Sequence, residues 1–267
     1  MITASDIWTR LEQIRSKKPL VLNITNMVVP KITANALLAL GASPAMAKSE
    51  HEIEELVSLS RALVLNTGTP TVSQVRVMRL AAAKALELDI PVVLDPVGAG
   101  ASRMRIDVPL ELMANGWVQI LRGNASEVMA LAGNQDKPRG VDSLHSSEQA
   151  LNAAHELCDK YDCAVCVSGE QDLVVAKEGS LKICNGHHLM SRVTGMGCSS
   201  TCLVAAFAAV EKDLFRAVGM GMAVMGLAGE MAATEAAGPG SLETAFLDTM
   251  YALDREMLEN IRWEKGD

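Results

Sequence analysis

Short runs of apolar residues alternate with longer amphipathic stretches through the first two-thirds of the chain. The apolar runs have the length of buried strands, and the stretches between them have the spacing of helices. Strands are predicted at 19–24, 62–66, 117–124 and 163–169, at the start of 90–100, and in a hairpin at 172–186 that turns at "KEGS". Helices are predicted within 1–19 and at 32–42, 71–89, 124–133 and 146–162.

The chain changes character after Gly197, where the pattern becomes almost wholly helical. Three successive helices are predicted at 198–212, 213–236 and 241–261, and the middle one is apolar nearly all round, which is typical of a buried helix. Alternating strands and helices favour an α/β fold with a mostly parallel central sheet flanked by helices, here with a helical C-terminal third. No linker or shift in composition interrupts the chain, so residues 1–267 are interpreted as a single domain.

Polar or glycine-rich loops follow the predicted strands. In an open α/β sheet, ligands bind beyond the carboxyl ends of the strands, so these loops are expected to line one binding edge. The loops are "NITN", "NTGTP", "DPVGAG", "RGNASE" and "SGEQD".

The segment "GMGC", Gly195–Cys198, is a glycine-rich turn that leads into a helix. Free N–H groups at a helix N-terminus bind anions such as a phosphoryl group, and the helix dipole lowers the pKa of a first-turn cysteine. Cys198 is therefore a candidate thiolate. The alternative is a buried, inert cysteine at an ordinary helix start.

Two carboxylates stand at predicted strand ends: Asp95 after "PVVL" and Glu127 in "NASE". Such oxygen ligands suit Mg²⁺ held together with water and phosphate oxygens. Each also has a simpler interpretation, because Asp95 precedes a proline in a turn and Glu127 can pair with Asn124 in a helix capping box. Arg122 can reach an ATP phosphate or be a surface arginine.

Composition narrows the choice of function. The net charge of −8 and the pI of about 5.2 make nucleic-acid binding improbable. No signal peptide or membrane-spanning run is evident, and the six cysteines indicate a reduced, cytoplasmic protein. Neither a P-loop nor a dinucleotide-binding glycine motif follows the first strand. The adjacent His187 and His188 are interpreted as structural, because neighbours on a strand face opposite ways.

Taken together, six segments resemble the hydroxyethylthiazole kinase family of thiamin salvage, a branch of the ribokinase-like superfamily. The resemblance covers nearly the whole chain from residue 19 onward. It implies a ribokinase-like fold, a homotrimer with sites at subunit interfaces, and Mg²⁺-dependent transfer of phosphate from ATP to 4-methyl-5-(2-hydroxyethyl)thiazole. The segments are "NITN", "LLALGASPAMA", "LNTGTP", "VVLDPVGAGAS", "LRGNASE" and "VTGMGC".

The resemblance also implies roles for individual residues, by motif. Asn26, Met46, Gly68 and Gly195 are expected beside the thiazole substrate. The remaining matches are Arg122 and Ser168 at ATP, Asp95 and Glu127 at Mg²⁺, Gly195, Met196 and Gly197 in an anion hole, and Cys198 facing the acceptor hydroxyl. Many ribokinase-like kinases have an aspartate where this chain has Cys198, so a thiol is expected to replace a carboxylate base.

Three rival functions remain compatible with the sequence. One is a related kinase for the pyrimidine precursor of thiamin. Another is an ATP- or ADP-dependent dehydratase that repairs hydrated nicotinamide cofactors, and the third is a non-catalytic binding protein with the same fold.

Overall fold

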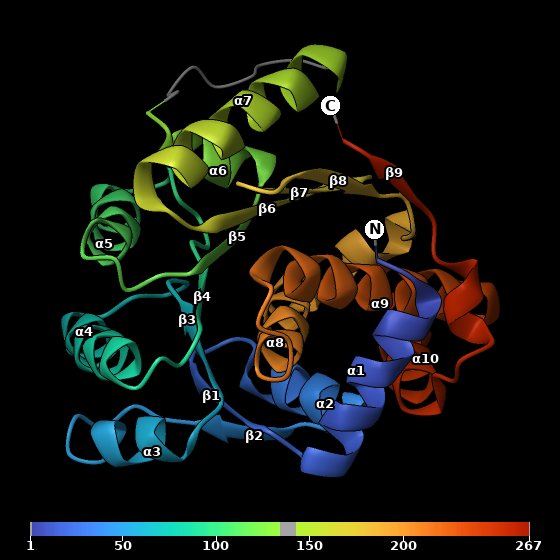
Figure 1. The fold of residues 1–267 in the computed structure, drawn as a ribbon, viewed down its shortest axis with the longest axis horizontal. Coiled ribbons are helices and arrows are strands. Elements are labelled where there is room, and N and C mark those ends of the chain that lie inside the picture. Colours follow the sequence, from blue (N-terminus) through green and yellow to red (C-terminus); the bar gives the residue numbers. More distant parts are fainter. Residues whose placement is uncertain (1, 134–142, 267) are drawn as a thin grey trace.

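The computed structural model, which describes residues 2–133 and 143–266, is built around one nine-stranded sheet (Figure 1). The strand order is β2-β1-β3-β4-β5-β6-β7-β8-β9. Strands β2 to β6 pair in parallel, and β6 to β9 pair antiparallel, so the predicted mostly parallel sheet is confirmed. The strands are β1 (Leu20–Ile24), β2 (Ser43–Met46), β3 (Ala62–Asn66), β4 (Val92–Asp95), β5 (Ile120–Asn124), β6 (Ala164–Ser168), β7 (Asp172–Ala176), β8 (Gly179–Ile183) and β9 (Trp263–Lys265).

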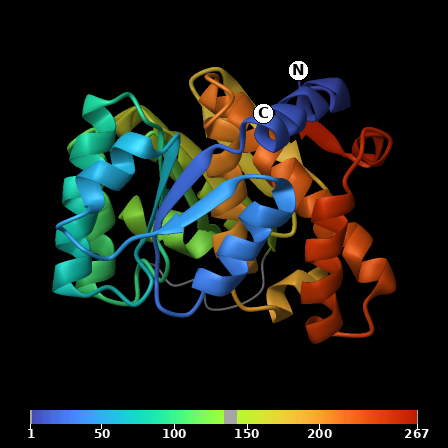
Figure 2. The same cartoon turned by 90° about the horizontal axis from the view of Figure 1, so that it is seen from below.

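Helices cover both faces of the sheet, with a separate hydrophobic core on each face. Figure 2 gives the same arrangement from below, with the cyan and green helices on one side and the orange and red helices on the other. One face carries α3 (Ile53–Leu59), α4 (Val72–Glu87), α5 (Arg103–Ala114), α6 (Ala125–Leu131) and α7 (Ser143–Tyr161). The other face carries α1 (Ala4–Lys17), α2 (Pro30–Leu40), α8 (Met196–Ala208), α9 (Leu214–Glu235) and α10 (Pro239–Ala252).

Local signals explain several helix boundaries. Thr71 caps α4 by accepting a hydrogen bond from the Gln74 N–H at 3.1 Å. Asn124 and Glu127 form the predicted capping box of α6. Helix α9 is long and apolar enough to cross a membrane, but 78% of its most apolar window is buried inside the protein, as expected for a core helix.

The predicted helix over 241–261 is wrong beyond Ala252. Helix α10 ends at Ala252, because Leu253 takes an extended conformation and the Asp254 carboxylate accepts the Met257 N–H at 2.9 Å, which starts a separate 3₁₀ turn, η2 (Met257–Asn260). The chain then adds the short edge strand β9. The other edge strand, β2, was not predicted either.

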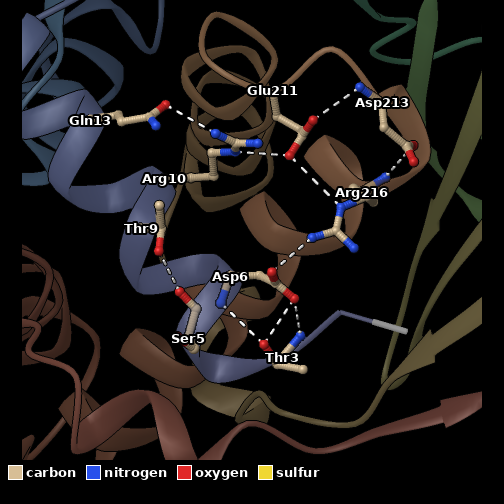
Figure 3. Close-up of polar contacts among 9 residues, drawn as sticks. All are labelled: Thr3, Ser5, Asp6, Thr9, Arg10, Gln13, Glu211, Asp213 and Arg216. Carbon is tan, nitrogen blue, oxygen red and sulfur yellow. Dashed lines mark hydrogen bonds and ion pairs between the residues drawn. The ribbon is translucent and has the colours of Figure 1, made fainter.

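The N-terminal helix is joined to the C-terminal helices by ion pairs (Figure 3). Arg10 on α1 donates from Nε to a Glu211 Oε2 atom 2.8 Å away, and Glu211 lies in the loop between α8 and α9. Arg216 on α9 pairs with Asp6 of α1 at 3.2 Å, and the Asp213 N–H donates to Glu211 at 3.1 Å. These contacts fix α1 against the start of α9.

Candidate active site

The carboxyl ends of the parallel strands bring most of the predicted site residues to one edge of the sheet. Asp95 ends β4, Ser168 ends β6, and Arg122 lies two residues before the end of β5. Asn26 follows β1, and Gly68 follows β3. The N-terminus of α8 meets the same edge, because Cys198 is the third residue of that helix.

Asn66, the last residue of β3, is the centre of the site and was not singled out from the sequence. Its amide nitrogen Nδ2 donates to Asp95 Oδ2 at 2.9 Å and to Cys198 Sγ at 3.2 Å. Its Oδ1 atom accepts from Asn26 Nδ2 at 2.9 Å and from the Gly68 N–H at 3.0 Å. One buried side chain therefore links the expected substrate, metal and catalytic residues. The signal available in the sequence was a polar residue that ends an otherwise apolar strand.

The Asp95 carboxylate is only 1% exposed. Thr201 on α8 donates to its Oδ2 atom at 2.9 Å, beside the bond from Asn66. Burial raises the pKa of Asp95 to about 6 although the positive charge of Arg122 opposes the shift; the charge of Glu127 raises the pKa further. Asp95 is therefore mostly ionised at neutral pH and holds a proton below about pH 6.

The sequence left two interpretations of Cys198 open, a thiolate and a buried neutral thiol, and the pKa of the thiol favours the second. Burial and the neighbouring Asp95 charge raise the pKa of the Cys198 thiol to about 12, although the hydrogen bond from Asn66 works in the opposite direction. The helix N-terminus is present as predicted, but burial and the like charge of Asp95 set the direction of the pKa shift. Cys198 is therefore a neutral thiol at physiological pH.

In the anion site predicted at the start of α8, fewer N–H groups are free than expected. Gly195 caps the helix with a φ of 92°, which favours glycine, and a Cβ atom there would lie 2.6 Å from Ile32. The Met196 N–H donates to the Val193 carbonyl at 3.4 Å, so it is turned back into the loop. Within the described residues, the N–H groups of Gly197 and Cys198 have no acceptor and stay available to an anion.

The positively charged guanidinium of Arg122 lies beside these two N–H groups. A Cβ atom at Gly197 would lie 3.0 Å from its Nη1, so the guanidinium is beside the helix start. Its Nη2 donates to Ser168 Oγ at 2.6 Å, while its buried Nε has no hydrogen-bond partner in the described part of the chain. The predicted pair of Arg122 and Ser168 is thus in contact, with donor capacity left for a ligand.

A cavity of about 770 Å³ extends from this anion site toward α9. Its lining includes Arg122, Ser168 and Gly197, segment 185–188 and residues of α9. The assignment of His187 and His188 to a strand is wrong: they lie at the start of a 3₁₀ turn, with ring centroids 4.2 Å apart, and both line this cavity. The volume is within the range of small-molecule sites.

The residues expected to bind Mg²⁺ fit a site completed by phosphate oxygens and water better than a site made of protein ligands alone. Glu127 accepts the Gly98 N–H on Oε1 and the Asn124 N–H on Oε2, each at 2.9 Å, so the capping role and a metal role must share its lone pairs. No group of three acidic, histidine or cysteine ligands occurs among the described residues. One or two carboxylates completed by phosphate oxygens and water is the usual Mg²⁺ arrangement at a nucleotide.

Of the expected substrate residues, Asn26 and Gly68 contact Asn66 and do not line the cavity. Asn26 is buried, and its Oδ1 atom accepts the Val28 N–H at 2.8 Å. A Cβ atom at Gly68 would lie 2.8 Å from the Asn26 amide, so these two residues pack closely. Met46 ends the edge strand β2, two strands away from β3, and lies outside the hydrogen-bond cluster of Asn66.

Comparison with known proteins gives a consistent result. The model of the hydroxyethylthiazole kinase family matches residues 11–256. A hydroxyethylthiazole kinase from Syntrophus aciditrophicus is 49% identical over 256 residues, which covers 96% of this chain and 95% of that protein.

Solved structures agree with the sequence relatives. A hydroxyethylthiazole kinase protein from Pyrococcus horikoshii OT3 superposes with a TM-score of 0.90 at 37% identity, covering 98% of this chain and 100% of that one. A ribokinase-like superfamily protein from Enterococcus faecalis superposes with a TM-score of 0.64 at 12% identity, over 89% and 88% of the two chains, which shows the shared fold.

Replacement of Asp95 by asparagine tests the burial of its charge. The folded state holds the Asp95 proton up to a pKa of about 6, above the ordinary value of 3.8, so its contribution to stability is present below about pH 4 and is lost as pH rises through 6. In urea unfolding with a metal chelator, we expect Asp95→Asn to raise the free energy of unfolding at pH 7.5 by on the order of 2 kcal/mol.

The gain in the free energy of unfolding from Asp95→Asn should become smaller as the pH is lowered toward 4. Asp107→Asn, which alters an exposed ion pair with Arg103, is the control and should show no comparable gain. A variant no more stable than the parent at pH 7.5 would contradict the cost of burying this carboxylate.

Proposed function

The chain belongs to the hydroxyethylthiazole kinase family, and from that premise we propose that its strand-end site transfers the γ-phosphoryl group of ATP to the hydroxyl of 4-methyl-5-(2-hydroxyethyl)thiazole. This reaction is the thiazole-salvage step of thiamin biosynthesis. The fold is ribokinase-like, and the whole chain is proposed to act as one kinase domain.

One observation supports this function most directly: the anion site and the polar cluster of Asn26 and Asn66 meet at Cys198. On one side of its thiol are the free N–H groups of Gly197 and Cys198 with Arg122. On the other side is the Asn26 amide, whose Nδ2 atom lies 3.9 Å from the sulfur. A phosphoryl donor in the cavity and an acceptor alcohol beside Asn26 would therefore face each other across this residue.

Phosphoryl transfer demands mainly positioning and neutralisation of charge. In the proposed mechanism, the acceptor oxygen bonds to the γ-phosphorus while the bond to the β-phosphate oxygen breaks, and the hydroxyl proton passes to an oxygen of the transferred phosphoryl group and from there to water. Arg122 and the N–H groups of Gly197 and Cys198 stabilise the charge on the transferring group. Ser168 orients Arg122 through its hydrogen bond.

Cys198 is proposed to orient the acceptor hydroxyl as a neutral thiol and not to remove its proton as a thiolate. The raised pKa of the thiol supports this role, and a loose transition state needs little base assistance. Asn66 holds the sulfur from one side, and Asp95 interacts with it from another.

Asp95 and Glu127 are the residues proposed to hold Mg²⁺ together with ATP. The metal would neutralise phosphate charge. The charge of Glu127 raises the Asp95 pKa, so the two carboxylates repel each other, and a bound cation would relieve that repulsion.

A homotrimer with sites at the subunit interfaces is also proposed. Large apolar side chains are exposed directly beside the expected substrate residues: Met27 at 74%, Val28 at 60% and Val72 at 82%. The Met27 N–H donates to Thr69 at 3.1 Å, which joins the loops after β1 and β3 into one surface. Burial of such side chains against another subunit is favourable. The six cysteines, all free, support a reduced cytoplasmic setting.

Consumption of ATP tests the function. With Mg²⁺, we expect ADP release that depends on the thiazole alcohol and yields its phosphate ester. The hydroxymethyl pyrimidine of thiamin biosynthesis should support less than about a hundredth of that rate, because a small polar site rejects a substrate that leaves its buried groups unpaired. Equal turnover of both alcohols, or ADP release without either, would contradict the proposal. Chelation of Mg²⁺ should abolish turnover.

Replacement of Cys198 by alanine distinguishes a thiol that orients the acceptor hydroxyl from a thiolate that removes its proton. We expect kcat to fall about 10- to 100-fold while the KM for ATP stays within about twofold, because the proposed phosphate contacts are backbone N–H groups and the Arg122 side chain, and alanine keeps them all. In the parent, kcat should show no alkaline rise between pH 7 and 9. A rise in that interval that disappears in Cys198→Ala would mean that the thiolate is the base after all.

The proposed subunit interface can be tested by placing a charge on it. We expect the parent to have three times the chain mass of 28.4 kDa in light scattering, and Val72→Glu to shift it to single chains with loss of activity. Leu86→Glu is the matched control, since Leu86 is 50% exposed at the other end of α4, and it should remain trimeric. A parent that is monomeric yet fully active would contradict the interface.

A further inference from the structure

One wall of the cavity is formed by Asn185–His188, the segment that follows β8. This segment has little regular structure of its own, so its position depends on side-chain contacts. The Asn185 side chain is buried, with 3% exposure, and all of its polar atoms are bonded. Its position determines where the two histidines lie along the cavity.

Glu230 on α9 holds this segment. Its Oε2 atom accepts from Asn185 Nδ2 at 3.2 Å and from the Gly186 N–H at 3.1 Å. The same carboxylate forms a two-bond ion pair with Arg262, at 2.8 Å to Oε1 and 2.7 Å to Oε2. These four donors, above all Arg262, lower the pKa of Glu230, so it stays ionised at neutral pH.

Arg262 connects the cluster to the end of the chain. It immediately precedes β9, and its N–H donates to Asn185 Oδ1 at 2.6 Å. Its Nη2 also donates to the Cys184 carbonyl at 3.1 Å. The segment is thus held from α9 on one side and from the C-terminal strand on the other.

Helix α9 approaches the segment too closely for any side chain at one position. A Cβ atom at Gly226 would lie 2.5 Å from the Asn185 carbonyl oxygen. Gly226 lines the cavity one helical turn before Glu230, so the same face of α9 forms the cavity wall and carries the carboxylate.

We propose that Glu230, with Arg262, is a positioning residue for ATP: the ion pair fixes the Asn185–His188 wall of the cavity and thereby sets nucleotide affinity. This inference rests on the proposed assignment of the cavity to ATP. The cluster is at the β8–β9 end of the sheet, whereas Asn26 and Gly68 follow β1 and β3 toward the other end. Loss of the ion pair should therefore weaken nucleotide binding and leave binding of the thiazole alcohol unchanged.

The test is Glu230→Gln, which keeps the shape of the side chain but turns one acceptor oxygen into an amide donor that faces other donors. We expect the KM for ATP, and the Kd for ADP measured by calorimetry, to rise about fivefold or more. The KM for the thiazole alcohol should stay within about twofold. Arg262→Lys, which keeps the charge but loses the two-bond geometry, should change the same two constants in the same direction.

Glu211→Gln is the matched control. Glu211 also pairs with two arginines and accepts a backbone N–H, but it fixes α1 and does not line the cavity. It should lower the melting temperature without changing nucleotide constants. If Glu211→Gln raises the KM for ATP as much as Glu230→Gln, the effect is general loosening and the proposal is overturned.

Arg122→Lys distinguishes failure of this inference from failure of the cavity assignment. If Arg122→Lys raises the KM for ATP and folded Glu230→Gln and Arg262→Lys do not, the cavity assignment stands and the role of Glu230 is overturned. If none of these variants changes the KM for ATP, the cavity does not bind the nucleotide and both proposals fail.

Discussion

Burial of the Asp95 carboxylate is the constraint on which the rest of the site depends. A carboxylate removed from water must be compensated by protein donors and nearby cations. Here the donors come from two elements, Asn66 at the end of β3 and Thr201 on α8, while Arg122 from β5 contributes its charge. These elements must therefore meet at the end of β4, which brings the helix N-terminus and the substrate loops to the same point.

Much of this arrangement was predictable because it follows from chain topology. Asp95, Arg122 and Ser168 are all at or near the ends of parallel strands, and such ends always share one edge of a sheet. The role of Asn66 was not predictable, since an amide becomes a hub only when Asn26 and Cys198, distant in sequence, are placed around it. The direction of the Cys198 pKa shift could not be predicted for a related reason. The sequence shows that Cys198 starts a helix, but it shows neither the burial of the thiol nor the nearby Asp95 charge, and both raise the pKa.

Two helices, α3 and α5, and two strands, β2 and β9, were not predicted from the sequence. The two strands are elements whose conformation depends on a partner. Strand β2 has four residues, including Pro44, and is a strand because it pairs with β1 at the edge of the sheet. Strand β9 has three residues and exists through its pairing with β8, where Trp263 lies opposite Ile183. Long periodic segments such as α4 and α9 carry enough local signal to be predicted without a partner.

The order of elements has a consequence for how the chain folds as it is made. Along the sheet, the strands follow almost the order of synthesis, and helices α3–α7 can cover their face as it grows. The other face is covered by α1 and α2 together with α8, α9 and α10 (Figure 1). That face must stay open to water until the last third of the polypeptide has left the ribosome, so an unfinished chain presents a broad apolar surface to chaperones and to aggregation.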